Sequence, residues 1–249
     1  MKKKGATTVE TEWTARQLEE AVATILIWLE EHRSDNVRAG MARYAIPAEK
    51  ALGISVGDLR RYAKLLGRDQ RLSEALWKTD VYEARMLAVF VGDPLKVSAK
   101  VMDEWCGDFD SWAICDTACF HLFDQTPHAL KKIFKWAKEK GEFQKRAAFA
   151  LLASAGDLSV EENLRCLPLI GKAAGDERNF VKKGVSWALR AMGSRHATLH
   201  AAALEMAERL VESESASARW IGRDALRFLK SAATLRRLEA KSRASRVAV

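Results

Sequence analysis

Apolar residues recur at helical spacing along almost the whole chain. Near the amino terminus this spacing groups a set of apolar residues on one side of a helix, namely Trp13, Leu18, Ala21, Ile25 and Leu29. No segment shows the strict alternation that is typical of a strand. Short breaks at glycine, proline and serine divide the sequence into about a dozen helices of ordinary length. The pattern predicts an all-α protein.

A weak internal repeat organises these helices. Four segments each place a basic residue before a helical apolar block, and these residues are Arg85, Arg146, Lys183 and Arg223. With Asp116 included, successive members lie about 30 to 40 residues apart, which is typical of stacked helix pairs. We therefore expect an α-solenoid of HEAT-like repeats, with the repeated basic residues facing a concave groove.

One solenoid domain accounts for the length of the chain. We divide its 249 residues into an N-terminal extension with the first helix (1–35), a HEAT-like repeat domain (36–235) and a basic C-terminal tail (236–249). Each helix pair buries its apolar face only against neighbouring pairs, so the repeats form a single domain.

The charge balance favours a polyanionic partner. The chain has 41 Lys and Arg against 33 Asp and Glu, a formal net charge of +8. The apolar run Ile25–Leu29 is too short to cross a bilayer, and the Lys2–Lys4 cluster is not followed by a signal-peptide core. The 4 cysteines form no C-x-x-C pair, which suits a reducing compartment. We expect a cytoplasmic monomer that does not associate with membranes.

A stripe of arginines is a candidate surface for phosphates. Arg219, Arg223 and Arg227 are spaced four residues apart and share one helix face, with Lys230 close by. A single basic residue on a helix is usually only a solvated side chain. A repeated stripe favours contact with a phosphate backbone.

Trp112 and Asp116 form the strongest candidate for chemistry. They lie four residues apart, so an indole and a carboxylate project from one helix face one turn apart, a combination suited to a cation. Trp187 occupies a corresponding position two repeats later. A lone Trp is more often a core residue. The Asp is harder to explain in this way, because an unpaired buried carboxylate is costly.

A zinc site is a weaker alternative. Cys115, Cys119, His121 and His128 have suitable side chains, but His121 lies off the face that the cysteines share, and no second pair completes a tetrahedral site. We interpret the cysteines as small buried residues and expect no metal and no cofactor. A metal-dependent enzyme in this region would contain zinc, which elemental analysis would detect.

Three segments resemble the active-site helices of a known family. They are Trp112–Asp116, Gln144–Ala148 and Phe180–Arg190, and the stretch from Met41 to Arg60 is similar to the family's amino-terminal signature. In their order and spacing they resemble the HEAT-like-repeat alkylpurine DNA glycosylases of the AlkD type, the DNA alkylation repair enzymes. The resemblance covers residues 38–230.

The resemblance implies a monofunctional DNA glycosylase. Its substrates would be cationic alkylated purines, such as 3-methyladenine and 7-methylguanine, in double-stranded DNA, and its reaction the hydrolysis of the N-glycosidic bond. Asp116 would stabilise the oxocarbenium-like sugar and position the water. Trp112 and Trp187 would present their faces to the cationic nucleotide, and Arg146 would hold a phosphate with a bidentate fork.

Further DNA contacts are expected around these residues. They would come from Lys183, Arg190, Tyr44, Arg219, Arg223 and Arg227. The alternative function is that of a non-catalytic solenoid that binds structured nucleic acid or a protein partner, since fold does not imply function. The presence of Asp116 beside Trp112 favours the enzyme, because an adaptor has no need of that carboxylate.

Overall fold

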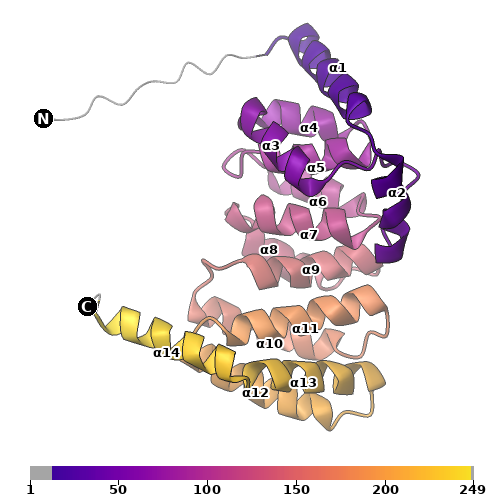
Figure 1. The fold of residues 1–249 in the computed structure, drawn as a ribbon. Helices are drawn as coiled ribbons and strands as arrows, with labels where there is room; N and C mark the ends of the chain where they lie inside the picture. The colour runs from indigo at the N-terminus through magenta and orange to yellow at the C-terminus, as the bar shows by residue number, and fades with distance from the viewer. Residues whose placement is uncertain (1–12, 248–249) are drawn as a thin grey trace, which may run out of the picture.

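The fold is all-helical, as the sequence predicts. A computed structural model describes residues 13–247, without the side chains of residues 242 and 244–247. This part of the chain contains fourteen α-helices and two short 3-10 helices, and no strand (Figure 1). Among these residues no helix combines the length and the hydropathy needed to cross a bilayer. The Lys2–Lys4 cluster lies outside the described residues.

Most of the helices alternate between two rows. The front row comprises α3 (Val56–Leu66), α5 (Tyr82–Val91), α7 (Trp112–His121), α9 (Glu142–Ser154), α11 (Asn179–Gly193) and α13 (Ala216–Leu229). The back row comprises α4 (Gln70–Trp77), α6 (Ala99–Gly107), α8 (Ala129–Trp136), α10 (Val160–Ala173) and α12 (Ala197–Val211). Each front-row helix packs against the next one along the row, and α4, α8, α10 and α12 pack against the front-row helix that follows (Figure 1). The predicted solenoid of stacked helix pairs is confirmed.

Five elements lie outside the two rows. They are α1 (Ala15–Glu31), α2 (Asp35–Met41), the 3-10 helices η1 (Ala42–Tyr44) and η2 (Phe123–Gln125), and α14 (Ala232–Val247). Helix α1 packs on α4 and α5. Helix α14 follows α13 and points away from the stack (Figure 1). Residues 236–247, which the sequence suggests are a tail, therefore continue a helix.

Local sequence signals explain where many helices begin. Ser, Thr and Asp side chains accept hydrogen bonds from backbone N–H groups of the first turn, and these caps are Thr14, Ser34, Ser55, Asp69, Ser98, Ser159 and Ser215. Gln17 and Glu162 complete two of these caps by bonding back to the cap residue. The starts of these helices are therefore determined by residues next to them in the sequence.

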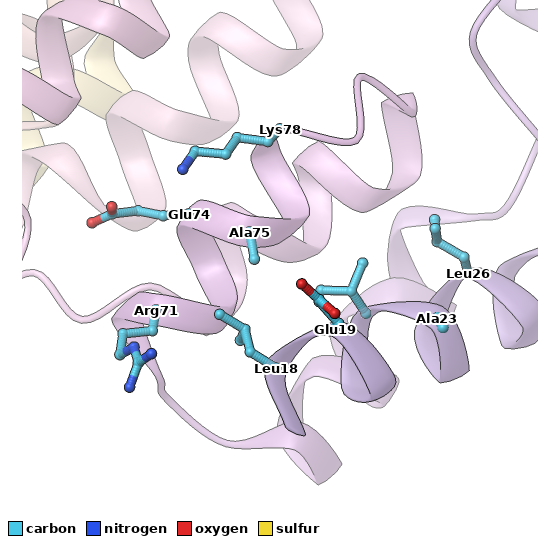
Figure 2. A pocket seen from close by; sticks show the side chains of 9 residues that line it. Leu18, Glu19, Ala23, Leu26, Arg71, Glu74, Ala75 and Lys78 are labelled. Carbon is cyan, nitrogen blue, oxygen red and sulfur yellow. The ribbon is translucent and has the colours of Figure 1, made fainter. Parts of the chain in front are cut away.

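The core runs along the stack between the rows. Trp136, Phe123 and Phe149 are among its largest fully buried side chains. The four cysteines are free and buried in it, as the sequence predicts. At the α1 end, α1 and α4 leave a groove of about 510 Å³ with Leu18 and Leu26 on one wall (Figure 2).

A buried carboxylate fixes the segment that joins η1 to α3. Glu83 on α5 accepts hydrogen bonds from the N–H groups of residues 52–54 at 2.8, 2.7 and 3.3 Å. Gly53 has a φ of 85°, and a Cβ there would lie 2.2 Å from the carbonyl oxygen of Ser34. The segment is therefore held by α5 through hydrogen bonds and packs closely against the start of α2.

Acid should weaken the stack through Asp176, which precedes α11. Arg178 donates to both of its carboxylate oxygens, at 2.9 and 2.6 Å, and Lys145 on α9 lies 3.3 Å away. Chiefly through Arg178, the pKa of Asp176 is lowered to about 2. Since its pKa is lower in the folded state, Asp176 stabilises the fold above about pH 4, and this stabilisation is lost as the pH falls towards 2.

Thermal unfolding between pH 6 and pH 2 measures this effect. The Tm of Asp176→Asn should fall less steeply with acid than that of the parent. Asp110→Asn, which removes an exposed carboxylate, is the control and should follow the parent curve. Parallel curves for the parent and Asp176→Asn would contradict the prediction.

Candidate active site

A buried ion pair joins three helices of the front row. Asp116 on α7 is 7% exposed, and Arg146 on α9 is 6% exposed. Arg146 donates from Nε to Oδ1 of Asp116 at 2.8 Å and from Nη2 to Oδ2 at 2.6 Å. Its Nη1 donates to the carbonyl oxygen of Phe180 on α11 at 2.8 Å. One guanidinium therefore fixes the carboxylate and connects α7, α9 and α11.

This pair explains why an apolar helix carries an Asp. Burial raises the pKa of the Asp116 carboxyl, and the hydrogen bonds from Arg146 act in the opposite direction. Burial lowers the pKa of Arg146, but the bonds to Asp116 outweigh this and the pKa is raised. A carboxylate has about four lone-pair positions, and Arg146 uses one on each oxygen. Each oxygen therefore keeps a position for another donor.

The position of Arg146 differs from the sequence expectation in one respect. The sequence analysis assigns its bidentate fork to a phosphate, whereas in the structure the fork holds Asp116. The physical reason is that a buried carboxylate without a partner is strongly destabilising, and Arg146 lies on the adjacent helix. Three of its five N–H donors are thereby committed within the protein.

Trp112 connects the ion pair to the segment before α3. It is the first residue of α7, one turn from Asp116, and its indole Nε1 donates to the backbone oxygen of Tyr44 at 2.7 Å. Tyr44 is 68% exposed. Ala45 follows with a φ of 53°, a left-handed turn that ends η1. Tyr44 therefore touches the site through its main chain and leaves its phenol accessible.

Trp187 lies beside an open cavity. Its ring packs edge-on against Phe120 of α7, with 4.6 Å between the ring centroids. The cavity has a volume of about 360 Å³, and its lining residues are Arg146, Lys183, Trp187, Arg190, Trp220 and Asp224. The structure thus brings together four of the predicted site residues with two that the sequence analysis missed. Asp116 is not among the lining residues.

The predicted arginine stripe on α13 has three different environments. Arg219 donates from Nη1 to two carbonyl oxygens of the turn before α13, at 2.9 and 2.8 Å. Arg227 donates to Oδ1 of Asp224 at 2.6 Å, although its side chain is mostly exposed. Arg223 is exposed. Arg219 therefore supports a turn, while the other two are accessible to a ligand.

The repeated basic residues also differ from one another. Each of the four lies on a front-row helix, as the repeat predicts. Arg85 on α5 is held by Asp80 at 2.8 Å, and Arg146 is held by Asp116. Lys183 and Arg223 are exposed. Two of the four positive charges are therefore neutralised within the protein.

A basic cleft that the sequence analysis missed lies between α3, α5 and α7. Its volume is about 510 Å³, and its lining includes Arg60, Lys64, Arg68 and Phe90. Within residues 13–247, none of these three cations forms an ion pair with a carboxylate. Arg60 and Lys64 are spaced four residues apart on α3, as the arginines on α13 are, so the sequence contains a signal for these two cations. Arg68 lies beyond the end of α3, and helical spacing does not predict its position.

The residues of the zinc alternative have separate partners. The thiols of Cys115 and Cys119 donate to carbonyl oxygens of α9 at 3.6 and 3.5 Å. His121 faces the guanidinium of Arg60, and its pKa is lowered by burial and by that positive charge. In the described part of the chain, no group of three or more His, Cys, Asp or Glu side chains is placed to hold a metal ion.

Solved structures share this fold at low sequence identity. A protein described as one of a new family related to the HEAT-like repeat DNA glycosylases, with affinity for branched DNA structures, has a TM-score of 0.69 and 17% identity over 83% of this chain and 94% of its own. AlkD2 from Streptococcus mutans has a TM-score of 0.58 and 18% identity over 86% and 100%. The protein smu.31 from Streptococcus mutans UA159 has a TM-score of 0.52 and 16% identity over 85% and 98%. These likenesses establish the fold.

Sequence comparison establishes the family. No curated protein matches the chain. A family model described as DNA alkylation repair enzyme matches residues 25–229. The match covers most of the chain and includes Asp116, Arg146 and Trp187, so the resemblance seen in the sequence is confirmed. The chain belongs to the family of DNA alkylation repair enzymes.

Proposed function

We propose that this protein is a monofunctional DNA glycosylase that releases cationic alkylated purines, such as 3-methyladenine and 7-methylguanine, from double-stranded DNA. The observation that carries the proposal is the Asp116 carboxylate, which Arg146 fixes one turn from Trp112. Arg146 also reaches the main chain of α11, the helix of Trp187. Membership of the DNA alkylation repair family supports the same activity.

The chemistry requires little acid catalysis, because an alkylated purine is already positively charged and leaves readily. What the protein must supply is stabilisation of the oxocarbenium-like deoxyribose and a water directed at its C1′ atom. The carboxylate of Asp116 supplies both through the lone-pair positions that Arg146 leaves free on its two oxygens. Arg146 orients the carboxylate, and the faces of Trp112 and Trp187 stabilise the cationic nucleotide.

The backbone of the DNA is held by side chains around this site. Lys183, Arg223 and Tyr44 are exposed, and Arg190 lines the cavity beside Trp187. Arg227 is also exposed, and it contacts a phosphate when its hydrogen bond to Asp224 breaks. Such contacts fix the position of the duplex without reading its sequence.

Replacing Arg223 and Arg227 together by Ala should weaken binding to damaged and undamaged duplexes alike. Each lost phosphate contact should reduce the slope of log K against log salt by about 1. Fluorescence anisotropy over a KCl series measures the slope. The matched control replaces Lys172 and Arg209 of the back row by Ala and should preserve the slope. An unchanged slope in the variant that lacks Arg223 and Arg227 would show that α13 does not contact the DNA backbone.

A duplex that contains a single 7-methylguanine tests the proposed activity. The protein should convert this position into an abasic site, which alkali turns into a strand break. Without alkali the strand should stay intact, because the proposed reaction breaks only the N-glycosidic bond. A duplex that resists alkali after incubation with excess protein would contradict the proposal, provided that a known alkylpurine glycosylase cleaves it in parallel.

A DNA-binding protein without catalysis is the second candidate. Two observations favour it: the small exposed fraction of Asp116, and the likeness to a protein described as having affinity for branched DNA. This function predicts tight binding of four-way junctions and no abasic product from the 7-methylguanine duplex. The two functions are therefore separated by the same experiment.

A further inference from the structure

The basic cleft between α3, α5 and α7 carries positive charge that its surroundings do not balance. Arg60, Lys64 and Arg68 line the cleft, are exposed, and pair with no carboxylate of residues 13–247. Three cations around one cleft repel one another, and a bound anion would relieve this repulsion. The lining therefore suits an anionic ligand.

The carboxylates nearest to these cations in the sequence are used elsewhere. Asp58 on α3 is held by Arg61. Asp69 accepts a hydrogen bond from the indole of Trp13 at 2.7 Å and caps the first turn of α4. On the other side of the cleft, Asp124 of η2 lines a different cavity. The cleft thus keeps its full positive charge.

His121 at the end of α7 completes the cleft. Nη2 of Arg60 donates to its Nε2, and because a guanidinium has no acceptor, the imidazole is neutral and carries its proton on Nδ1. The ring of Phe90 holds both groups, with the guanidinium and the imidazole centroid each 5.4 Å from its centroid. Burial and the charge of Arg60 lower the pKa of His121.

The arrangement of the cations fits a strand better than a single phosphate. Arg60 and Lys64 are separated by about 6 Å along the axis of α3, because each helical residue advances the chain by about 1.5 Å. Consecutive phosphates of a nucleic-acid strand have a similar separation. An isolated phosphate would instead require the cations to converge on one point.

The cleft adjoins the candidate active site. His121 lies five residues after Asp116 on α7, and the ring of the preceding residue, Phe120, contacts Trp187. Helix α3 lies two places before α7 in the front row, roughly 20 Å at the usual distance between packed helices (Figure 1). A duplex along the front row with one sugar at Asp116 therefore has the cleft within reach.

We propose that the cleft binds two consecutive phosphates of a DNA strand, and that His121 takes up a proton from solvent as they bind. Arg60 and protonated His121 hold one phosphate, and Lys64 and Arg68 hold the next. Nε2 of His121 changes from an acceptor for Arg60 into a donor to the phosphate, and the guanidinium turns to the same phosphate. This inference rests on the proposed function and extends it, because base release alone requires no such proton.

Fluorescence anisotropy with an undamaged duplex at pH 6 and pH 8 tests the proton uptake. The parent should bind about fivefold more tightly at pH 6, because one proton is gained with the DNA. His121→Gln keeps an acceptor for Arg60 but cannot take up a proton, so most of this difference should disappear. Two controls should retain it: His128→Gln, which changes an imidazole outside the cleft, and Asp124→Asn, which removes a carboxyl whose pKa burial raises to about 6.

A variant of the cations keeps the test decisive if His121→Gln unfolds. Replacing Arg60 and Lys64 together by Gln should reduce the slope of log K against log salt by about 2, because two phosphate contacts are lost. The matched control replaces Lys172 and Arg209 of the back row by Gln and should preserve the slope. A preserved slope in the cleft variant would overturn the inference. Equal affinities of the parent at the two pH values, or the parent's pH dependence in folded His121→Gln, would overturn it as well.

Failure of this inference and failure of the proposed function give different results. If the parent releases 7-methylguanine and the cleft variants bind DNA as the parent does, only the assignment of the cleft is wrong. If the parent releases no base, but the cleft variants lose the salt slope and the pH dependence, the cleft assignment stands and the glycosylase function falls.

Discussion

Asp116→Asn is expected to slow the release of alkylated bases so strongly that almost none is released in the time that the parent needs for completion, while DNA binding remains nearly intact. The amide has the shape of the carboxylate but lacks the negative charge that stabilises the oxocarbenium-like sugar. Removal of one such electrostatic group costs on the order of 10² to 10³ in rate. Single-turnover release of 7-methylguanine measures the loss, and anisotropy with undamaged duplex measures binding.

The substitution also leaves Arg146 buried without its anion, so the Tm of the variant must be measured and the assays run well below it. Asp176→Asn is the matched control, because it removes a carboxylate that pairs with Arg178 but lies outside the site. This control should release bases at the rate of the parent. Release at that rate by Asp116→Asn as well would refute the catalytic role of the carboxylate.

Arg146→Met should cause the largest loss of stability. It leaves the Asp116 carboxylate buried and unpaired and removes a donor from the Phe180 carbonyl, so unfolding should become easier by about 3–5 kcal/mol at neutral pH. Urea denaturation of parent and variant gives this difference. The double variant Asp116→Asn, Arg146→Met should recover part of it, because no unpaired charge then remains buried at this position.

The loss of stability in Arg146→Met should depend on pH in a defined direction. Burial raises the pKa of Asp116, and the variant removes the Arg146 bonds that act against this. A carboxyl whose pKa is higher in the folded state favours folding most below its unfolded pKa, and this advantage disappears as the pH rises through the folded pKa. Arg146→Met should therefore be least destabilised near pH 4 and increasingly destabilised towards pH 7. If the loss of stability in Arg146→Met does not change with pH, Asp116 and Arg146 do not form a buried ion pair.

The sequence is sufficient to predict the row of site residues but not their partners. Helical periodicity and the repeat place Asp116, Arg146 and Trp187 on successive stacked helices, as the structure shows. The ion pair between the first two depends on the lateral distance between α7 and α9, which periodicity does not contain. The cost of burying Asp116 alone indicates that it needs a cation, and in the structure that cation is Arg146.

The cavity residues that the sequence analysis missed show the same limit, because a sequence pattern does not give the contacts between helices. The spacing of Trp220 and Asp224 is visible in the sequence, but it gains meaning only when α13 is known to lie beside α11. Similarly, the spacing of the arginines on α13 defines a face but not the carbonyl oxygens that Arg219 finds in the preceding turn. Patterns along one helix predict a face, and contacts between turns and helices decide its chemistry.

Mass measurement of the free bases released from alkylated duplex DNA tests the central claim most directly. We predict that the parent protein releases 3-methyladenine and 7-methylguanine and that Asp116→Asn releases neither. A folded parent that binds the same DNA and releases no base would contradict the assignment of this protein as a glycosylase.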